Sequence, residues 1–216
     1  MPQFPRHLID GYRTFASQRL PTEQSRYREL SERGQSPEVM VIGCCDSRVS
    51  PEVIFDAGPG ELFVVRNIAN LVPVYQPDEN AHGVSAALEF AVNVLRVKHI
   101  LVLGHAQCGG IRAFIDKIEP LSPGDFIGKW MAMFVKPGEK VEQRDHETMA
   151  DFTVRIEKAA VFRSLENLMT FPFVRGAVER GELNLHGAYF GVAEGSLFVL
   201  DQVTKEFRGA REQLGE

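Results

Sequence analysis

The chain has 216 residues, of which 44% are hydrophobic and 25% are charged, and its formal net charge is −5. This length suits one α/β domain with a full hydrophobic core and is short for two such domains. The 24 basic residues are scattered and outnumbered by 29 acidic ones, which argues against a surface that binds nucleic acid. Three cysteines are too few and too unevenly spaced for a disulfide framework, so we expect free thiols in a reducing compartment.

The beginning of the chain does not resemble a targeting segment. Charged side chains such as Arg6, Asp10 and Arg13 interrupt it, and it lacks the continuous apolar core of a signal peptide. No stretch approaches the roughly 18 apolar residues of a membrane span. We therefore expect a cytoplasmic protein that partners with neither membranes nor nucleic acid.

Apolar side chains recur at helical spacing over residues 4–33. Pro21 divides this segment into two predicted helices, and Gly34 ends the second one. Such an amphipathic segment could pack on its own domain or on a neighbouring subunit. The sequence therefore predicts an N-terminal helical arm over residues 1–34.

Three short, continuous apolar runs follow the arm, at Val39–Gly43, Leu62–Val65 and Ile100–Leu103. Runs of this kind are typical of parallel strands that are buried on both faces. The segment Gly83–Val97 lies before the third run and fits a crossover helix of a right-handed βαβ unit. We therefore predict an α/β fold with a central, mostly parallel β-sheet flanked by helices.

The rest of the chain is predicted to be helical first and extended later. Residues 123–180 are mainly helical in pattern, and Leu185–Val192 with Ser196–Leu200 resemble a late pair of strands. No internal repeat or linker indicates a second domain. We expect a single domain over residues 1–216.

Three metal-binding side chains follow the predicted strands. Cys44 comes after the first strand, and His105 and Cys108 come after the third in the order His-x-x-Cys. Active sites of open α/β sheets lie beyond the carboxyl ends of the strands, so these residues should converge. Two thiolates and one imidazole leave one zinc position open, which is the pattern of catalytic zinc rather than of closed structural sites. The prediction is one Zn²⁺ per subunit.

Two charged residues follow Cys44 within one turn of chain. Asp46 can lie beside a metal-bound water, and Arg48 can hold its carboxylate in place. Without a metal nearby, the two would be better read as a structural ion pair. Cys45 is set aside, because strand alternation would direct its side chain away from that of Cys44.

Four motifs together resemble those of the β-class carbonic anhydrases: Cys44-Cys-Asp-Ser-Arg48, Phe63-Val-Val-Arg-Asn67, Ala69-Asn70 and Gly104-His-Ala-Gln-Cys-Gly-Gly110. The resemblance is strongest over residues 35–110. It divides the predicted domain into the arm (1–34), a zinc-site core (35–120), and C-terminal helices with late strands (121–216).

The resemblance implies a role for each matching residue. Cys44, His105 and Cys108 match the zinc ligands, and Asp46 and Arg48 match the catalytic dyad. Substrate contacts are implied for four more residues: Gln35, which would hydrogen-bond bicarbonate, and Phe63, Ile68 and Phe90, which would line the carbon dioxide pocket. Some members carry Tyr where this chain has Phe90, so a hydroxyl is missing there.

The family divides into groups that differ in regulation. Members inhibited by bicarbonate carry Trp three residues before the first ligand cysteine, where this chain has Val41. Together with Gln35, this implies the plant-like group with an open site. Family members bury their N-terminal helices on a neighbouring subunit, so a homodimer or a homotetramer is implied.

The expected activity is the reversible hydration of carbon dioxide to bicarbonate and a proton by a zinc-bound hydroxide, a chemistry for which carbonic anhydrase is itself the standard example. Two alternatives remain open. The same site could hydrolyse carbonyl sulfide or carbon disulfide, or zinc could serve only to hold the fold together. Asp46 and Arg48 beside a three-ligand set favour catalysis, since structural sites usually recruit a fourth protein ligand.

Overall fold

The computed structural model describes residues 4–213. The chain divides into two compact units, Met1–Ser36 and Pro37–Glu216. This boundary lies two residues from the one predicted between the arm and the zinc-site core. The division at residue 120 and the single domain over residues 1–216 remain predictions.

The first unit is helical from Arg6 to Arg33. Helix α1 spans Arg6–Thr14, a π-helical segment η1 spans Phe15–Arg19, and α2 spans Leu20–Arg33. The expected separation at Pro21 does not interrupt the helical path, because proline is well accommodated in the first turn of a helix. Gly34 ends α2 as predicted, with a φ of 79° that glycine adopts at little cost.

The second unit is built on a six-stranded sheet with the order β2-β1-β3-β4-β5-β6. Its strands are β1 Val39–Cys44, β2 Leu62–Asn67, β3 His99–His105, β4 Asn184–Gly191, β5 Ser196–Leu200 and β6 Phe207–Gly209. The pairs among β2, β1, β3 and β4 are parallel, and β5 and β6 pair antiparallel. The mostly parallel sheet and the late strand pair are therefore confirmed, and the short strand β6 was not predicted.

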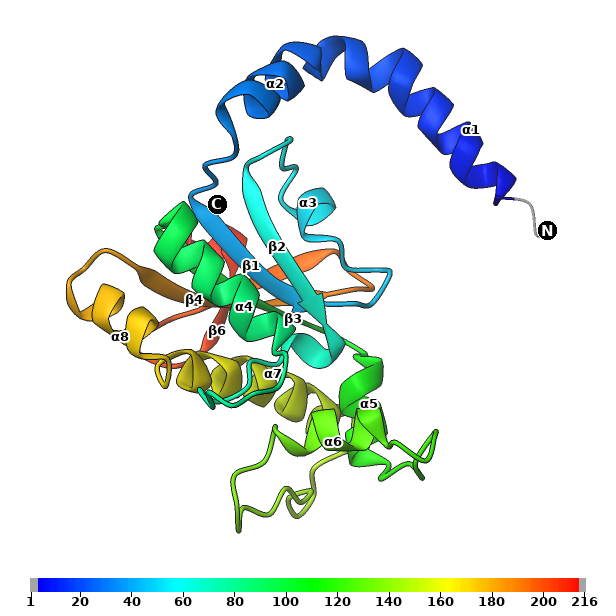
Figure 1. The fold of residues 1–216 in the computed structure, drawn as a ribbon. Helices are drawn as coiled ribbons and strands as arrows, with labels where there is room; N and C mark the ends of the chain where they lie inside the picture. The colour runs from blue at the N-terminus through cyan, green and yellow to red at the C-terminus, as the bar shows by residue number, and fades with distance from the viewer. Residues whose placement is uncertain (1–3, 214–216) are drawn as a thin grey trace. The chain divides into compact units, whose positions relative to one another are not determined.

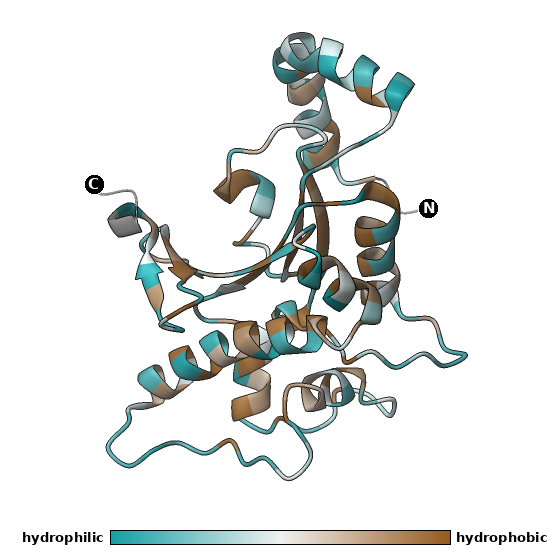
Figure 2. Cartoon of the chain, turned by 90° about the vertical axis from the view of Figure 1, so that its left-hand side faces the viewer, coloured by the Kyte–Doolittle hydropathy of each residue, from teal (hydrophilic) through white to brown (hydrophobic). Residues whose placement is uncertain are grey.

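The strands reach farther than their apolar runs. Strand β1 includes Cys44, and β3 continues to His105, so these two residues end their strands instead of following them as expected. Both strands are largely hydrophobic, as the brown central strands of Figure 2 show. The extra residues remain in the sheet because backbone pairing continues past the apolar run, for example between Cys44 and Asn67.

The helical elements of the second unit are α3 Pro51–Ile54, η2 Ile68–Asn70, α4 Gly83–Glu89, η3 Phe90–Leu95, α5 Gly109–Ile115, α6 Phe126–Ala132, α7 Met149–Leu168, α8 Pro172–Glu179 and α9 Ala210–Gln213. The predicted crossover helix is thus present as α4 and η3, and α5 begins directly after Cys108. No helix in the described part of the chain is both long and apolar enough to cross a membrane.

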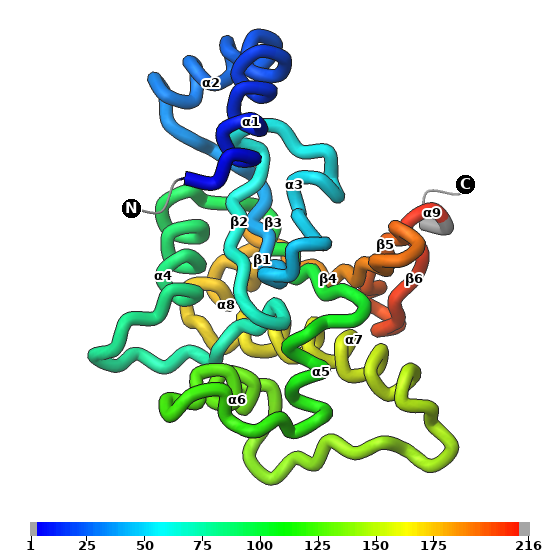
Figure 3. The backbone as a smooth tube through the Cα atoms, turned by 90° about the vertical axis from the view of Figure 1, so that its right-hand side faces the viewer, coloured from blue at the N-terminus to red at the C-terminus, as the bar shows by residue number. Residues whose placement is uncertain are grey.

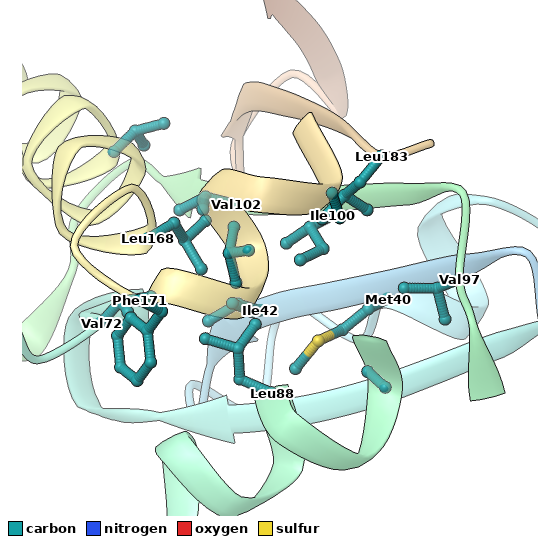
Figure 4. Packing of buried hydrophobic residues seen from close by; sticks show 14 residues of the cluster. Met40, Ile42, Val72, Leu88, Val97, Ile100, Val102, Leu168, Phe171 and Leu183 are labelled. Atoms are coloured by element: carbon teal, nitrogen blue, oxygen red, sulfur yellow. The ribbon is translucent and has the colours of Figure 1, made fainter. Parts of the chain in front are cut away.

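The main core lies between one face of the sheet and the helices α4, α7 and α8 (Figure 1). Met40 and Ile42 project from β1 into it, and Leu88 of α4 meets Ile42 there (Figure 4). Phe171, the largest fully buried side chain, lies beside them just before α8. This core holds the strands in register and so fixes the positions of their carboxyl ends.

A second cluster of buried residues surrounds the ends of β1 and β3. It contains Cys44, Cys108, Ile111 of α5, Met131 of α6 and Phe152 of α7. Strand β3 leads at its end toward α5, and α5 packs against α6 (Figure 3). The carboxyl edge of the sheet is therefore enclosed on one side by three helices.

Candidate metal centre

The three predicted ligands converge at this edge of the sheet. Cys44 ends β1, His105 ends β3, and Cys108 immediately precedes α5. Their ligand atoms all lie within 4.8 Å of one another, and all three residues are buried. The Sγ atoms of Cys44 and Cys108 are 4.0 Å apart. The sheet thus brings together residues that are 64 positions apart in the chain.

His105 is oriented as a metal ligand would be. Its Nδ1 lies 2.9 Å from the carbonyl oxygen of Ala106, which can only accept, so Nδ1 carries the proton. Its Nε2 is then an acceptor, and this buried atom has no hydrogen-bond partner among the described residues. A buried polar atom without a partner is costly, and a metal ion would satisfy it.

The contact between the two thiols shifts their pKa values in opposite directions. A hydrogen bond from Cys108 lowers the pKa of Cys44 to about 4 despite its burial. The same contact, together with burial, raises the pKa of Cys108 far above its usual value. A divalent cation at this point would favour the thiolate form of both. Two sulfurs and one free imidazole nitrogen therefore fit zinc.

Asp46 and Arg48 form the predicted pair. Arg48 donates from Nε to Oδ1 of Asp46 at 2.9 Å and from Nη2 to Oδ2 at 2.7 Å. The backbone N–H of Arg48 also donates to Oδ1, at 3.0 Å. The side-chain hydrogen bonds from Arg48 hold the pKa of Asp46 well below its usual range. The carboxylate is therefore ionised beside the ligand cluster, while its catalytic role remains a prediction.

Arg66 supports the loop after Cys44; it lies within the motif Phe63–Asn67, but the sequence assigned it no role. From the neighbouring strand β2, its Nε donates to the carbonyl oxygen of Cys44 at 2.7 Å, and its Nη2 to that of Asp46 at 2.6 Å. An arginine directly after the apolar run Leu62–Val65 was the available signal. Cys45 is exposed and lies outside the ligand cluster, as expected.

The loop that carries Cys108 is held from two sides. Arg48 donates from Nη2 to the carbonyl oxygen of Gln107 at 3.0 Å. The backbone N–H of Cys108 donates to Oε1 of Glu157 at 2.9 Å, and Tyr189 donates its hydroxyl to Oε2 at 2.6 Å. The sequence did not predict a role for Glu157 or Tyr189. The available signal for Glu157 was an acidic residue on the buried side of a predicted helix.

The implied substrate residues lie in three places. Phe63 of β2 faces Phe90 of η3, with ring centroids 6.0 Å apart. Phe63 pairs with Met40, four residues before Cys44, which places it about 13 Å along the sheet from the metal end. Ile68 contacts Gly110, beside the ligand loop, in a space that only glycine leaves free. Gln35 is exposed in the first unit, and its contact with substrate remains a prediction.

Two sulfurs and an imidazole that could hold a metal ion lie at the carboxyl edge of a mostly parallel sheet in an α/β protein. The family model described as carbonic anhydrase matches residues 39–197. The chain is 36% identical over 202 residues to the carbonic anhydrase of Pseudomonas aeruginosa, covering 94% of this chain and 90% of that protein. It is 39% identical over 171 residues to the chloroplastic beta carbonic anhydrase 5 of Arabidopsis thaliana, covering 78% of this chain but only 55% of that protein.

Solved structures give the same assignment. The β-carbonic anhydrase CcaA superposes with a TM-score of 0.85 at 27% identity, covering 94% of this chain and 91% of that one. A tetrameric β-carbonic anhydrase of Sordaria macrospora gives a TM-score of 0.75 at 28% identity, covering 90% and 95%. This chain belongs to the β-class carbonic anhydrases, a family of lyases, which confirms the resemblance seen in the sequence. Its place in the plant-like group remains a prediction.

Proposed function

We propose that this protein catalyses the reversible hydration of carbon dioxide to bicarbonate and a proton, with one zinc ion held by Cys44, His105 and Cys108. One observation carries the proposal: two sulfurs and an unpartnered imidazole nitrogen lie within 4.8 Å of one another, next to an ionised Asp46. Membership of the family supports the same reaction. Zinc bound there supplies a Lewis acid that activates water at neutral pH, a chemistry for which carbonic anhydrase is itself the standard example.

Asp46 orients the attacking water. Oδ1 accepts two hydrogen bonds from Arg48, whereas Oδ2 accepts only one and has a second lone pair that can accept a hydrogen bond from water. Because Arg48 keeps the carboxylate ionised, Asp46 accepts a hydrogen bond from the water and does not donate one. Arg48 is in turn fixed by the carbonyl oxygen of Gln107, so the pair cannot turn freely.

The apolar pocket for carbon dioxide is formed by Ile68, Phe63 and Phe90, with Gln35 donating to bicarbonate. Phe63 and Phe90 lie far along the sheet from the metal end of the same chain, which supports a pocket completed by a second copy. We propose a homodimer or homotetramer on this basis, and the Sordaria macrospora relatives are described as tetrameric. A cytoplasmic location is proposed as well, although one relative is named as chloroplastic.

The test is a stopped-flow assay of the zinc-loaded full chain with carbon dioxide, carbonyl sulfide and carbon disulfide as parallel substrates. We expect saturable hydration of carbon dioxide, with at most minor turnover of the two sulfur compounds. Turnover of a sulfur compound alone would establish the rival hydrolase. A folded, zinc-loaded chain that turns over none of the three would establish a non-catalytic zinc module.

A further inference from the structure

Glu157 is a buried carboxyl group that the proposed reaction does not use. It lies on α7 and is 2% exposed, which is rare for a carboxyl group unless it is paired. Both of its oxygens accept hydrogen bonds, one from the backbone N–H of Cys108 and one from the hydroxyl of Tyr189. Burial raises the pKa of its carboxyl group. Burying a carboxyl group costs free energy of folding, so its position next to the loop that carries Cys108 suggests a function.

The peptide that joins Gln107 to Cys108 is held at both ends. Its N–H donates to Glu157, and its carbonyl oxygen accepts from Arg48. Gln107 has a φ of 57°, in the left-handed region that residues other than glycine rarely adopt. Such a peptide needs contacts that fix its direction, and these are the two that the structure provides. One peptide therefore links the ligand loop to the Asp46–Arg48 pair.

The carboxyl group is itself rigidly placed. Helix α7 approaches β3 closely at Gly104, where a Cβ atom would stand 2.6 Å from Val161 Cγ2 and 3.7 Å from the carbonyl oxygen of Glu157. On the other side, Tyr189 of β4 is 4% exposed. Its ring packs against Phe207, with the ring centroids 6.2 Å apart. The Glu157 oxygens thus have a fixed position relative to the strand that carries His105.

We propose that Glu157 is a positioning residue for the metal centre, with Tyr189 as its anchor. By accepting from the Cys108 N–H, it directs the Cys108 sulfur toward Cys44 and presents the Gln107 carbonyl oxygen to Arg48. The ligand set and the Asp46–Arg48 pair are thereby aligned through one peptide. The proposal rests on the zinc site of the proposed function and adds a residue that acts through Cys108.

Two variants separate positioning from charge. Glu157→Leu keeps a similar volume but leaves the Cys108 N–H and the Tyr189 hydroxyl without a partner. Glu157→Gln keeps an amide oxygen for Cys108 and turns its NH₂ toward the Tyr189 oxygen, which can accept. We expect Glu157→Leu to lower zinc affinity by about 10- to 100-fold, as is typical for residues that hydrogen-bond metal ligands. We expect Glu157→Gln to retain the affinity of the unsubstituted protein.

The measurement is competition for Zn²⁺ between the full chain and a chelator, paired with absorption spectra of the Co²⁺-substituted protein. Thiolate-to-cobalt bands report ligand geometry and should change in Glu157→Leu only. Asn167→Ala is the matched control, because this buried residue of the same helix donates to the Val72 carbonyl oxygen, away from Cys108. It should lower thermal stability and leave zinc affinity and the cobalt spectrum unchanged.

Two results would overturn the proposal: a Glu157→Leu protein with unchanged zinc affinity and cobalt spectrum, or a Glu157→Gln protein that loses as much affinity as Glu157→Leu. If Glu157→Leu does not fold, Tyr189→Phe removes only the anchoring hydroxyl and must still weaken zinc binding, and equal affinity there would reject the inference. An unsubstituted chain that binds no zinc would instead reject the proposed function.

Discussion

The metal end of the sheet and the N-terminal helical unit are organised in opposite ways. Around the metal centre, Cys44, His105 and Cys108 are all buried. Hydrogen bonds with Arg48, Arg66 and Glu157 fix the backbone at Gln107, Cys44 and Cys108, respectively. In the first unit, none of the described helical residues is buried. Because the hydrogen bonds around the metal centre lie within the chain, the positions of its three side chains are fixed before a metal ion or substrate binds. The helical unit, by contrast, has apolar surface that the described part of the chain does not fully cover.

The apolar side chains of the helical unit show the contrast most plainly. Phe4 is 66% exposed, Leu8 51% and Tyr12 65%, all on one amphipathic segment. Helical stability in proteins comes mainly from packing an apolar face, so a segment of this kind gains stability when it is covered. The comparison predicts that substitutions at the metal end act within one chain, and that those in the helical unit act on association between chains.

The largest expected effect is on metal content. Cys44→Ser, His105→Ala and Cys108→Ser should each abolish stoichiometric zinc, because each removes one of only three protein ligands. Elemental analysis of the purified proteins measures this. Cys45→Ser is the control, since Cys45 is exposed and outside the cluster, and it should retain one zinc per chain. If one of the three variants binds a full equivalent of zinc, the residue substituted in it is not a ligand.

Next in size is the effect of Asp46→Asn on turnover. The variant should keep its zinc and lose at least about 100-fold in kcat, because a neutral amide can donate as well as accept and no longer imposes one orientation on water. Stopped-flow hydration of carbon dioxide, with zinc quantified in the same sample, gives the answer. Unchanged turnover in the zinc-loaded variant would make the Asp46–Arg48 contact purely structural.

The same substitution in the two regions sharpens the comparison. Leu168 of α7 is fully buried in the main core, so Leu168→Ala should lower the free energy of unfolding by about 2–5 kcal/mol. Leu8 is half exposed, so Leu8→Ala should change it by less than about 0.5 kcal/mol in dilute solution. Denaturant unfolding measures the free energy of unfolding of both variants. Leu8→Ala is also expected to weaken association between chains, which sedimentation measures. Equal losses of stability would show that the helical unit folds as part of the main core.

The smallest effect concerns pH. Burial, together with the nearby His99, lowers the pKa of His186, whose Nε2 lies 3.1 Å from Nδ1 of His99. The unfolded chain therefore takes up a proton here before the folded chain does, so stability should decrease as pH falls below the ordinary histidine pKa of about 6.5. Between about pH 7.5 and pH 5, the free energy of unfolding of the unsubstituted protein should fall more steeply than that of His186→Gln. An identical pH dependence in both would assign the acid sensitivity to other groups.

Local patterns were enough to predict the first three strands and the convergence of Cys44, His105 and Cys108. The apolar runs of β1, β2 and β3 reflect burial on both faces, and a ligand at the end of each of two adjacent parallel strands must approach the other. What the sequence could not show depends on distant partners. Arg66 supports a loop 22 residues before it, and Glu157 contacts a backbone N–H 49 residues before it. Strand β6 is only three residues long and has no periodicity to detect.

The proposed substrate pocket shows the same limit. Phe63 and Phe90 do meet, but they do so away from the metal end of their own chain, which neither residue spacing nor hydropathy indicates. Their position follows from the register of β2 with β1. Contacts between copies of a chain are harder still to predict from sequence, since they depend on which surfaces remain exposed after folding.

The central claim is that the metal held by Cys44, His105 and Cys108 serves catalysis in an already folded protein. The most direct test is stepwise removal of zinc by a chelator, with carbon dioxide hydration and circular dichroism recorded on the same samples. We expect activity to fall in proportion to the zinc removed and to return when zinc is restored, while the helical signal stays constant. Activity that is independent of zinc content, or a fold that is lost together with zinc, would contradict the claim.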